Sequence, residues 1–317
     1  MTAAGTLVAE LSDFGLLRCS GAEAQSFLQG QLSCDVTGLA PGQALYGSYN
    51  SPKGRMLASF LLWRDDAGYA LQLPRSLCAP IAKRLSMYVL RSKVTVRDAS
   101  DDFTLIGVAG ASAHALLQTL FQSIPAAPLA MTAAEPASLL RLDEARFLIV
   151  AAAARGREIR DALCRDAPPA SKAAWDLTNI RAGIPFITPA TQDEFVPQMA
   201  NLDLLGGVSF TKGCYPGQEI VARMHYLGKL KQRMYLANIA GDAVPQPGDK
   251  LYSASTGGQA TGMIVNAAPS PAGGHDVLAV LQIGSFGAGD AHLASADGPR
   301  LKFFALPYKI PASPATN

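Results

Sequence analysis

The sequence predicts an α+β protein whose last part is a small antiparallel β-barrel or sandwich. Up to about Arg233, helical patterns and strand patterns follow one another along the chain. Beyond it, short apolar runs alternate with Pro/Gly turns such as Pro247-Gly248-Asp249, a rhythm typical of small barrels. The 317 residues, 49% hydrophobic and 16% charged, are enough for two or three domains with a substantial buried core.

The first elements follow from local signals. Ser20 and Glu23 have the spacing of a capping box, and apolar residues at helical spacing follow, so we expect a helix over 21–32. Pro80 suits the first turn of a helix whose apolar side is Ile81, Leu85 and Tyr88. Alternating apolar residues between turns predict strands over 44–50, 55–64, 69–73 and 93–97.

The middle of the chain contains one segment that needs to be tested as a membrane span. Residues 104–134 contain no Asp, Glu, Lys or Arg, but glutamines, a histidine and two prolines interrupt them. A span needs about 20 mostly apolar residues. We therefore expect a buried strand over 104–108 and a helix over 112–122, and no membrane association.

The remaining elements are predicted in the same way. We expect a hairpin over 139–142 and 147–151, helices over 157–165, 171–182 and 218–227, and strands over 234–238, 250–253, 262–266 and 277–283. Residues 192–207 are expected to be mostly loop, and 312–317 a disordered tail.

Composition and motifs give no support to several classes of function. The net charge of +2 is too small for a nucleic-acid footprint made by bulk charge. Five cysteines without a C-x-x-C indicate reduced thiols in the cytoplasm, and the N-terminus lacks the pattern of a signal peptide. The chain has no P-loop, no G-x-G-x-x-G between strand and helix, no G-x-S-x-G, and no histidines at metal-ligand spacing.

The most informative stretch is K-G-C-Y-P-G-Q-E, residues 212–219. Cys214 lies beside Lys212, and Pro216-Gly217 suits a turn into a helix that begins at Gln218. A nearby cation or a helix N-terminus lowers the pKa of a thiol and favours the reactive thiolate. We expect such an activated thiol here; the alternative is a buried structural cysteine.

Two basic segments are candidate anion sites. Residues 212–233 hold five cations against the single acid Glu219, with Tyr215, His225 and Tyr226 among them. Such a surface suits an anionic ligand with a flat ring, or RNA, whereas a solvated face is the alternative. In the predicted turn 51–55, Lys53 and Arg55 could hold a carboxylate or phosphate, or form an ordinary charged hairpin tip.

At these residues the sequence resembles a known family. Residues 195–202 (FVPQMANL) and 205–223 (LGGVSFTKGCYPGQEIVAR) closely resemble the signature of the YgfZ family, folate-binding proteins related to the T-protein (aminomethyltransferase) of the glycine cleavage system. Residues 27–36, 52–56 and 182–185 agree with it, so the resemblance covers essentially the whole chain.

The resemblance implies a fold and a role. The fold would be three domains in a ring around a central hole that holds tetrahydrofolate or a related folate. Residues 1–232 would form two α+β domains, the second inserted at roughly 50–165, and 233–317 a β-barrel. The role would be that of an accessory protein in the assembly or repair of iron–sulfur enzymes, including those that thiolate tRNA. Its partners would be those enzymes or assembly factors, and tRNA weakly.

Two departures from the T-protein bear on activity. That enzyme has paired aspartates where this chain has Ala58 and Ser59. Its R-x-E-A-G corresponds to residues 179–183, where Asn179 replaces the arginine and Arg181 replaces the glutamate. An aminomethyltransferase or methyltransferase that uses folate is therefore the alternative function, and whether this chain is an enzyme stays open. Such an enzyme needs a general base, for which the candidates are Asp176, Glu194 and Glu219.

These arguments define the expected site. Cys214, with Lys212 to activate it, would be a nucleophile, a redox group or a transient cluster ligand, and no resident metal is expected. The residues expected to bind folate come from the motif and from the basic segments. They are Tyr215, Gln218, Glu219, Arg223, Lys53, Arg55, Asp176 and Arg181.

Overall fold

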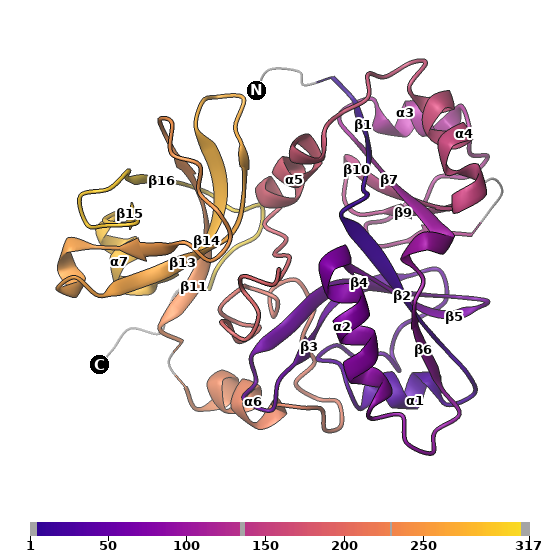
Figure 1. Cartoon of the computed structure of the whole chain (residues 1–317), viewed down its shortest axis with the longest axis horizontal. Coiled ribbons are helices and arrows are strands. Elements are labelled where there is room, and N and C mark those ends of the chain that lie inside the picture. Colours follow the sequence, from indigo (N-terminus) through magenta and orange to yellow (C-terminus); the bar gives the residue numbers. More distant parts are fainter. Residues whose placement is uncertain (1–4, 134–136, 229, 312–317) are drawn as a thin grey trace. The chain divides into compact units, whose positions relative to one another are not determined.

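In a computed structural model, the structure describes residues 5–133, 137–228 and 230–311. The chain divides into two compact units, and Figure 1 labels the helices and strands that they contain. Unit 1 consists of Met1–Gln31, Asp35–Tyr46 and Phe60–Trp175, and unit 2 of Leu32–Cys34, Gly47–Ser59 and Asp176–Asn317. The expected domain limits at residues 50, 165 and 232 stay predictions.

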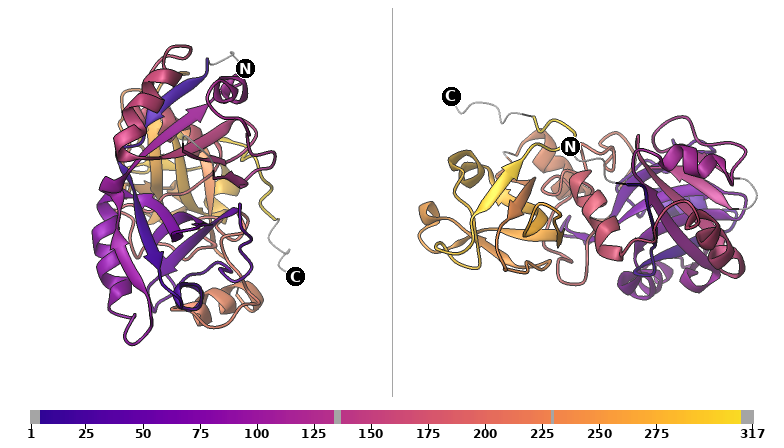
Figure 2. Two further views of the ribbon diagram at one scale, coloured as in Figure 1. Left: turned by 90° about the vertical axis from the view of Figure 1, so that its right-hand side faces the viewer. Right: turned by 90° about the horizontal axis from the view of Figure 1, so that it is seen from above.

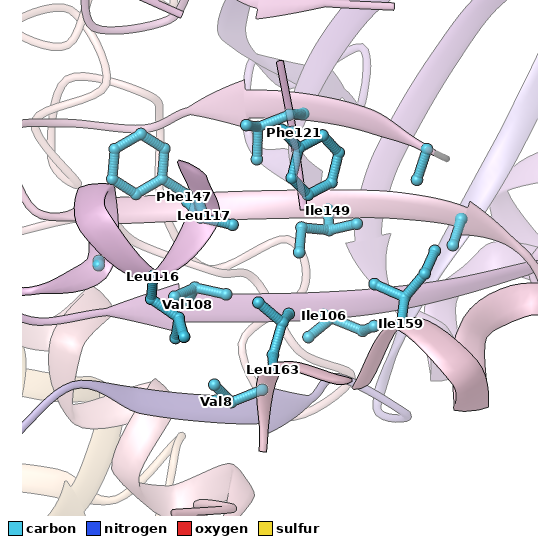
Figure 3. Packing of buried hydrophobic residues seen from close by; sticks show 14 of the residues in the cluster. Val8, Ile106, Val108, Leu116, Leu117, Phe121, Phe147, Ile149, Ile159 and Leu163 are labelled. Atoms are coloured by element: carbon cyan, nitrogen blue, oxygen red, sulfur yellow. The ribbon is translucent and has the colours of Figure 1, made fainter. Parts of the chain in front are cut away.

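Unit 1 contains a five-stranded antiparallel sheet with helices packed against it. The strand order is β1 (Leu7–Glu10), β7 (Phe103–Ala109), β10 (Arg146–Ala152), β9 (Ser138–Arg141) and β8 (Met131–Thr132). Alternate residues of these strands face one side, where they pack against α3 (Ala113–Gln118) and α4 (Ala153–Leu163), as Figure 3 shows. This core is fully buried and apolar, which fixes the register of the sheet.

The second sheet has the strand order β3 (Ala44–Asn50), β4 (Met56–Asp65), β5 (Gly68–Pro74), β2 (Phe14–Ser20) and β6 (Thr95–Asp98). Three helical segments accompany it: α1 (Ala24–Gln29), α2 (Arg75–Ser86) and the short η1 (Ser100–Asp102). The ends of β3 and β4 that flank turn 51–55 belong to unit 2.

Unit 2 also contains α5 (Lys172–Arg181), of which the last six residues belong to this unit, and α6 (Gln218–Tyr226). Its six-stranded sheet has the order β15 (His292–Leu293), β12 (Lys250–Tyr252), β13 (Ala260–Pro269), β14 (His275–Gln282), β11 (Gln232–Ile239) and β16 (Leu301–Phe304). The helical turns η2 (Ala254–Thr256) and α7 (Ile283–Ala288) complete it.

The two ends of this sheet are joined to each other. His292 forms a bridge with Arg300, and the Leu301 N–H donates to the Ala291 carbonyl at 2.9 Å. The sheet therefore curls into a small barrel around an apolar core, as the sequence predicts; Figure 2 shows these strands, orange to yellow, from two further sides.

Most predicted elements are confirmed, but α3 ends at Gln118, four residues before the predicted 122, and three further local predictions are wrong. Glu23 is the N-cap of α1 and its carboxylate accepts the Lys93 N–H at 2.6 Å, so it forms no capping box and the helix is shorter than expected. Pro80 is the sixth residue of α2, because the helix begins directly after Pro74. Helix α4 begins at Ala153, four residues before the predicted 157, because no cap marks its start.

Among the described residues, no helix is both long and apolar enough to cross a membrane. The expected disordered tail, 312–317, lies outside the described part of the chain.

Candidate functional site

The segment from Ser209 to Gly217, here called the thiol loop, presents Cys214 to solvent. Cys214 is exposed, whereas its neighbour Tyr215 is only 6% exposed and Lys212 is half-buried. The loop is thus anchored on both sides of the thiol while the thiol itself stays open. The alternative of a buried structural cysteine is therefore wrong.

Lys212 anchors the loop through its ammonium group. Its Nζ donates to the carbonyl oxygens of Leu32 and Cys34 at 2.7 and 2.9 Å and lies 5.2 Å from the centroid of the Tyr215 ring. Hydrogen bonds from a charged donor are stronger than neutral ones, and a cation over an aromatic ring is attracted to it. Lys212 therefore holds the loop in place. Its expected effect on the ionisation of Cys214 stays a prediction.

Segment 32–34 is tied to the loop a second time through Ser33. The Ser33 hydroxyl donates to the Gly207 carbonyl at 2.6 Å, and the Ser209 N–H donates to the Ser33 carbonyl at 2.9 Å. These bonds are buried or partly buried, so breaking them would leave polar groups without partners. Hydrogen bonds thus hold together two segments that are far apart in the sequence.

Helix α6 begins four residues after Cys214, at a glycine contact. Gly217, its N-cap, has φ of +75°, which favours glycine. A Cβ at Gly217 would lie 2.5 Å from the Cα of Gly54 and 2.5 Å from the Ser51 carbonyl. The basic turn 51–55 is therefore packed directly against the end of the thiol loop, which the sequence alone did not reveal.

The predicted folate-binding residues on α6 remain accessible. Glu219 and Arg223 are exposed, and the half-buried Gln218 donates from Nε2 to the Lys212 carbonyl at 3.4 Å. Lys53 in the turn is also exposed. These side chains thus belong to the helix that follows the thiol loop and to the turn that contacts it.

The other predicted residues have protein partners. Arg55 donates to the backbone carbonyls of Asp193 and Glu194, and Arg181 donates from Nε to Asp276 Oδ2 at 2.9 Å. Asp176, half-buried on α5, also has a partner in the structure. These guanidinium groups support neighbouring segments, and neither is presented as a free cation.

The basic stretch 212–233 offers fewer free cations than its composition suggests. Arg233 forms a bidentate ion pair with Asp203 at 2.7 and 2.9 Å, and the Lys212 ammonium donates to backbone carbonyls. Arg223 and Lys231 are exposed, and Lys229 lies outside the described residues. Some of the aromatic rings in this stretch pack against other rings of the protein, since His225 stacks on Phe210 with ring centroids 3.7 Å apart.

Among the described residues of unit 2, four buried side-chain polar atoms lack a hydrogen-bond partner: Tyr215 Oη, Asn50 Nδ2, Gln198 Oε1 and, in the barrel, His275 Nδ1. Leaving such an atom unpaired costs about 1–3 kcal/mol, so these atoms mark places where a ligand or water is expected. Burial also raises the pKa of Tyr215 to about 12, so its hydroxyl stays protonated at neutral pH. Sequence reasoning missed Asn50 and Gln198; their only signal is a polar residue beside apolar neighbours.

The remaining cysteines have the opposite environment. Cys19, Cys34 and Cys78 are buried and Cys164 is partly buried, all as free thiols. Burial raises the pKa of Cys19 to about 12 and that of Cys78 to about 11. No group of three or more His, Cys, Asp or Glu side chains in the described segments is arranged to hold a metal ion.

Comparison with known proteins gives the family and the fold. The model of the GCVT N-terminal domain family matches residues 1–139. The "tRNA-modifying protein YgfZ" of Klebsiella pneumoniae (strain 342) is 37% identical over 243 residues, which cover 76% of this chain and 74% of that protein. Its counterpart from Escherichia coli (strain K12 / DH10B) is 36% identical over the same shares.

Among solved structures, the glycine cleavage system aminomethyltransferase T from Bartonella henselae superimposes with a TM-score of 0.77 at 16% identity, covering 96% of this chain and 87% of that one. At this identity the likeness concerns the fold alone, and it confirms the predicted aminomethyltransferase-like α+β class. The relatives, together with the motif that surrounds the exposed thiol, show that the chain belongs to the YgfZ family.

Proposed function

We propose that this protein binds a reduced folate and acts in the cytoplasm as an accessory factor for the assembly or repair of iron–sulfur enzymes that modify tRNA. The observation that carries the proposal is the single open thiol on an anchored loop: Cys214 is exposed between the fixed residues Lys212 and Tyr215. The tRNA-modifying relatives support the tRNA part, and the aminomethyltransferase-like fold supports the folate part.

The donor set around the loop fits a pterin. A pterin ring presents both donors and acceptors, and the unpaired atoms Tyr215 Oη, Asn50 Nδ2 and Gln198 Oε1 offer complementary groups in unit 2. The anionic glutamate tail would meet Lys53 and Arg223, which are exposed, whereas Arg55 and Arg181 are held by other groups. Bound tetrahydrofolate would supply one-carbon or redox chemistry that the side chains lack.

Cys214 would act on a partner molecule. It is exposed, and the described residues provide no metal-binding group to share its work. A thiolate in such a position can attack an electrophile, exchange with a disulfide or ligate iron of a partner's cluster. We place its role at this contact with the partner enzyme.

Catalysis of aminomethyl transfer is less well supported. Ala58 and Ser59, in the place of the T-protein's aspartates, are buried, and the Ser59 hydroxyl donates to the Pro185 carbonyl at 2.9 Å and accepts the Ile187 N–H at 3.0 Å. These positions thus have structural partners and provide no carboxylate. Turnover of methylene-tetrahydrofolate by the purified protein with an amine donor would favour this alternative.

The experiment is complementation in bacteria that lack their own YgfZ protein, with thiolated tRNA nucleosides measured by mass spectrometry. We expect the wild type and Cys164→Ala, a matched removal of a partly buried thiol, to restore them, and Cys214→Ala to fail. Titration calorimetry with tetrahydrofolate should show that Cys214→Ala binds like the wild type and that Tyr215→Phe binds about tenfold more weakly, since it lacks the unpaired hydroxyl. Full restoration by Cys214→Ala would contradict the proposal.

A further inference from the structure

The C-terminal barrel carries a cleft that the thiol loop does not use. Its volume is about 510 Å³, within the usual range for sites of small molecules or single groups of a larger ligand. Side chains of β11, α7, β16 and the segment after β16 line it. They include Tyr235, Phe286, Phe304, Leu306, Tyr308 and Lys309.

The wall of this cleft is aromatic and ordered. Tyr235 and Phe286 stack with ring centroids 3.7 Å apart and planes 9° from parallel, and Phe303 meets both rings edge-on. Phe304, by contrast, is 46% exposed, a large fraction for a phenylalanine. The mutually packed rings fix the wall, while the Phe304 ring remains available to a flat partner.

The charges at the cleft are positive. Lys309 lines it, and Lys302 Nζ lies 5.7 Å from the centroid of the Phe304 ring. Within the described chain neither lysine forms an ion pair, and none of the lining residues is acidic. A ligand that combines a flat ring with negative charge on either side of it therefore fits this surface.

We propose that this cleft binds an unpaired base of RNA, with the base against Phe304 and the adjacent phosphates near Lys302 and Lys309. Single-stranded RNA is recognised in this way, because every base has a face that stacks on an aromatic ring while cations follow the backbone. That the polymer is RNA rests on the proposed function in tRNA modification. The surface differs from 212–233, where Lys212 and Arg233 already have protein partners.

The test is fluorescence anisotropy of a labelled eight-nucleotide single-stranded RNA with the full-length protein. Phe304→Ala should weaken binding about tenfold or more, and Phe304→Trp, which keeps a stacking ring, should retain it. Lys302→Ala and Lys309→Ala should each lower the slope of log affinity against log salt by about 0.7. Circular dichroism checks that each variant is folded.

Two matched variants control for general effects. Tyr88→Ala removes a ring that is 45% exposed in unit 1, and Lys250→Ala removes an exposed lysine from β12 of the same barrel; both should bind like the wild type. A duplex of equal length should show no dependence on Phe304. The inference is overturned if the wild type does not bind the single strand, if Tyr88→Ala weakens binding as much as Phe304→Ala, or if Phe304→Ala changes only self-association.

This result is separable from that of the proposed function. Cys214→Ala should bind the single-stranded RNA with wild-type affinity, because Cys214 does not line the cleft. If that variant restores tRNA thiolation, the accessory role fails while the RNA measurement still stands. If Phe304→Ala binds RNA normally and Cys214→Ala fails to complement, only the cleft inference is wrong.

Discussion

Two cysteines of this chain, Cys214 and Cys19, show how a fold presents one thiol to solvent and buries another. Cys19 lies on β2, is 1% exposed, and its pKa is raised to about 12 by burial. Cys214 lies on a loop without regular structure and is exposed. The difference teaches that an exposed thiol on a loop depends on its neighbours for a fixed position, here the half-buried Lys212 on one side and the buried Tyr215 on the other.

The largest contrast is expected in alkylation. In the native protein at pH 8, iodoacetamide should modify Cys214 first, whereas Cys19 should react about 1,000-fold more slowly than in the unfolded chain. Raising the pKa of Cys19 from its usual 9.0 to about 12 lowers its thiolate fraction by that factor. Peptide mass spectrometry over time measures both rates. Equal labelling of Cys19 and Cys214 in the native state would remove the contrast.

The next effect concerns the glycine at the end of the thiol loop. Gly217→Ala should lower the free energy of unfolding by about 3 kcal/mol, because the residue has φ of +75° and the new Cβ would meet backbone atoms of Gly54 at 2.5 Å. The matched control is Gly213→Ala, whose Cβ would have no atom within 4 Å, so it should change stability by less than about 0.5 kcal/mol. Urea unfolding compares the two; similar values would contradict the described packing.

Removing the Lys212 ammonium should have a smaller effect. Lys212→Ala should cost about 2 kcal/mol of unfolding free energy, since the carbonyls of Leu32 and Cys34 lose a charged donor. The exposed Lys53→Ala serves as control and should cost less than about 0.5 kcal/mol. Amide hydrogen exchange should become faster at Ser33 and Ser209 in the Lys212 variant alone. Unchanged exchange there would mean that other contacts hold the loop.

The smallest effect is a dependence on pH. Burial raises the pKa of Cys19 in the folded state, so its protonated thiol contributes stability that is complete below pH 9 and is lost as pH rises towards 12. Between pH 8 and pH 10 the wild type should lose roughly 1 kcal/mol more unfolding free energy than Cys19→Ala. Urea titrations at these pH values measure the difference. Parallel losses in both proteins would show that Cys19 titrates normally.

Local sequence patterns predicted the limits of an element well where only residues within that element determine them. Strand β3 and helix α6 lie within one residue of their predicted limits, and 192–207 is loop. The predictions failed where a distant group decided the outcome. The Glu23 carboxylate accepts the N–H of Lys93 instead of completing the predicted capping box with Ser20, and no local pattern indicates this partner.

The same limit applies to the candidate site. The residues around Cys214 could be grouped from the sequence because they belong to one motif. Arg55, Arg181 and Arg233 were equally plausible cations, yet each is held by a carbonyl or carboxylate far along the chain. Asn50 and Gln198 stand out because each has a buried polar atom without a partner, a property that only the folded structure reveals.

The close approach of Gly54 to Gly217 has a consequence for how this region can vary among relatives. The two glycines join a hairpin near the start of the chain to a helix in its second half. A Cβ at Gly217 would meet the Gly54 backbone at 2.5 Å, and one at Gly54 would lie 3.0 Å from the Gly217 carbonyl and 2.9 Å from the Ile220 Cβ. Changes at the two positions should therefore be inherited together or not at all. We therefore expect turn 51–55 and the thiol loop to change together among relatives, despite the long stretch of sequence that separates them.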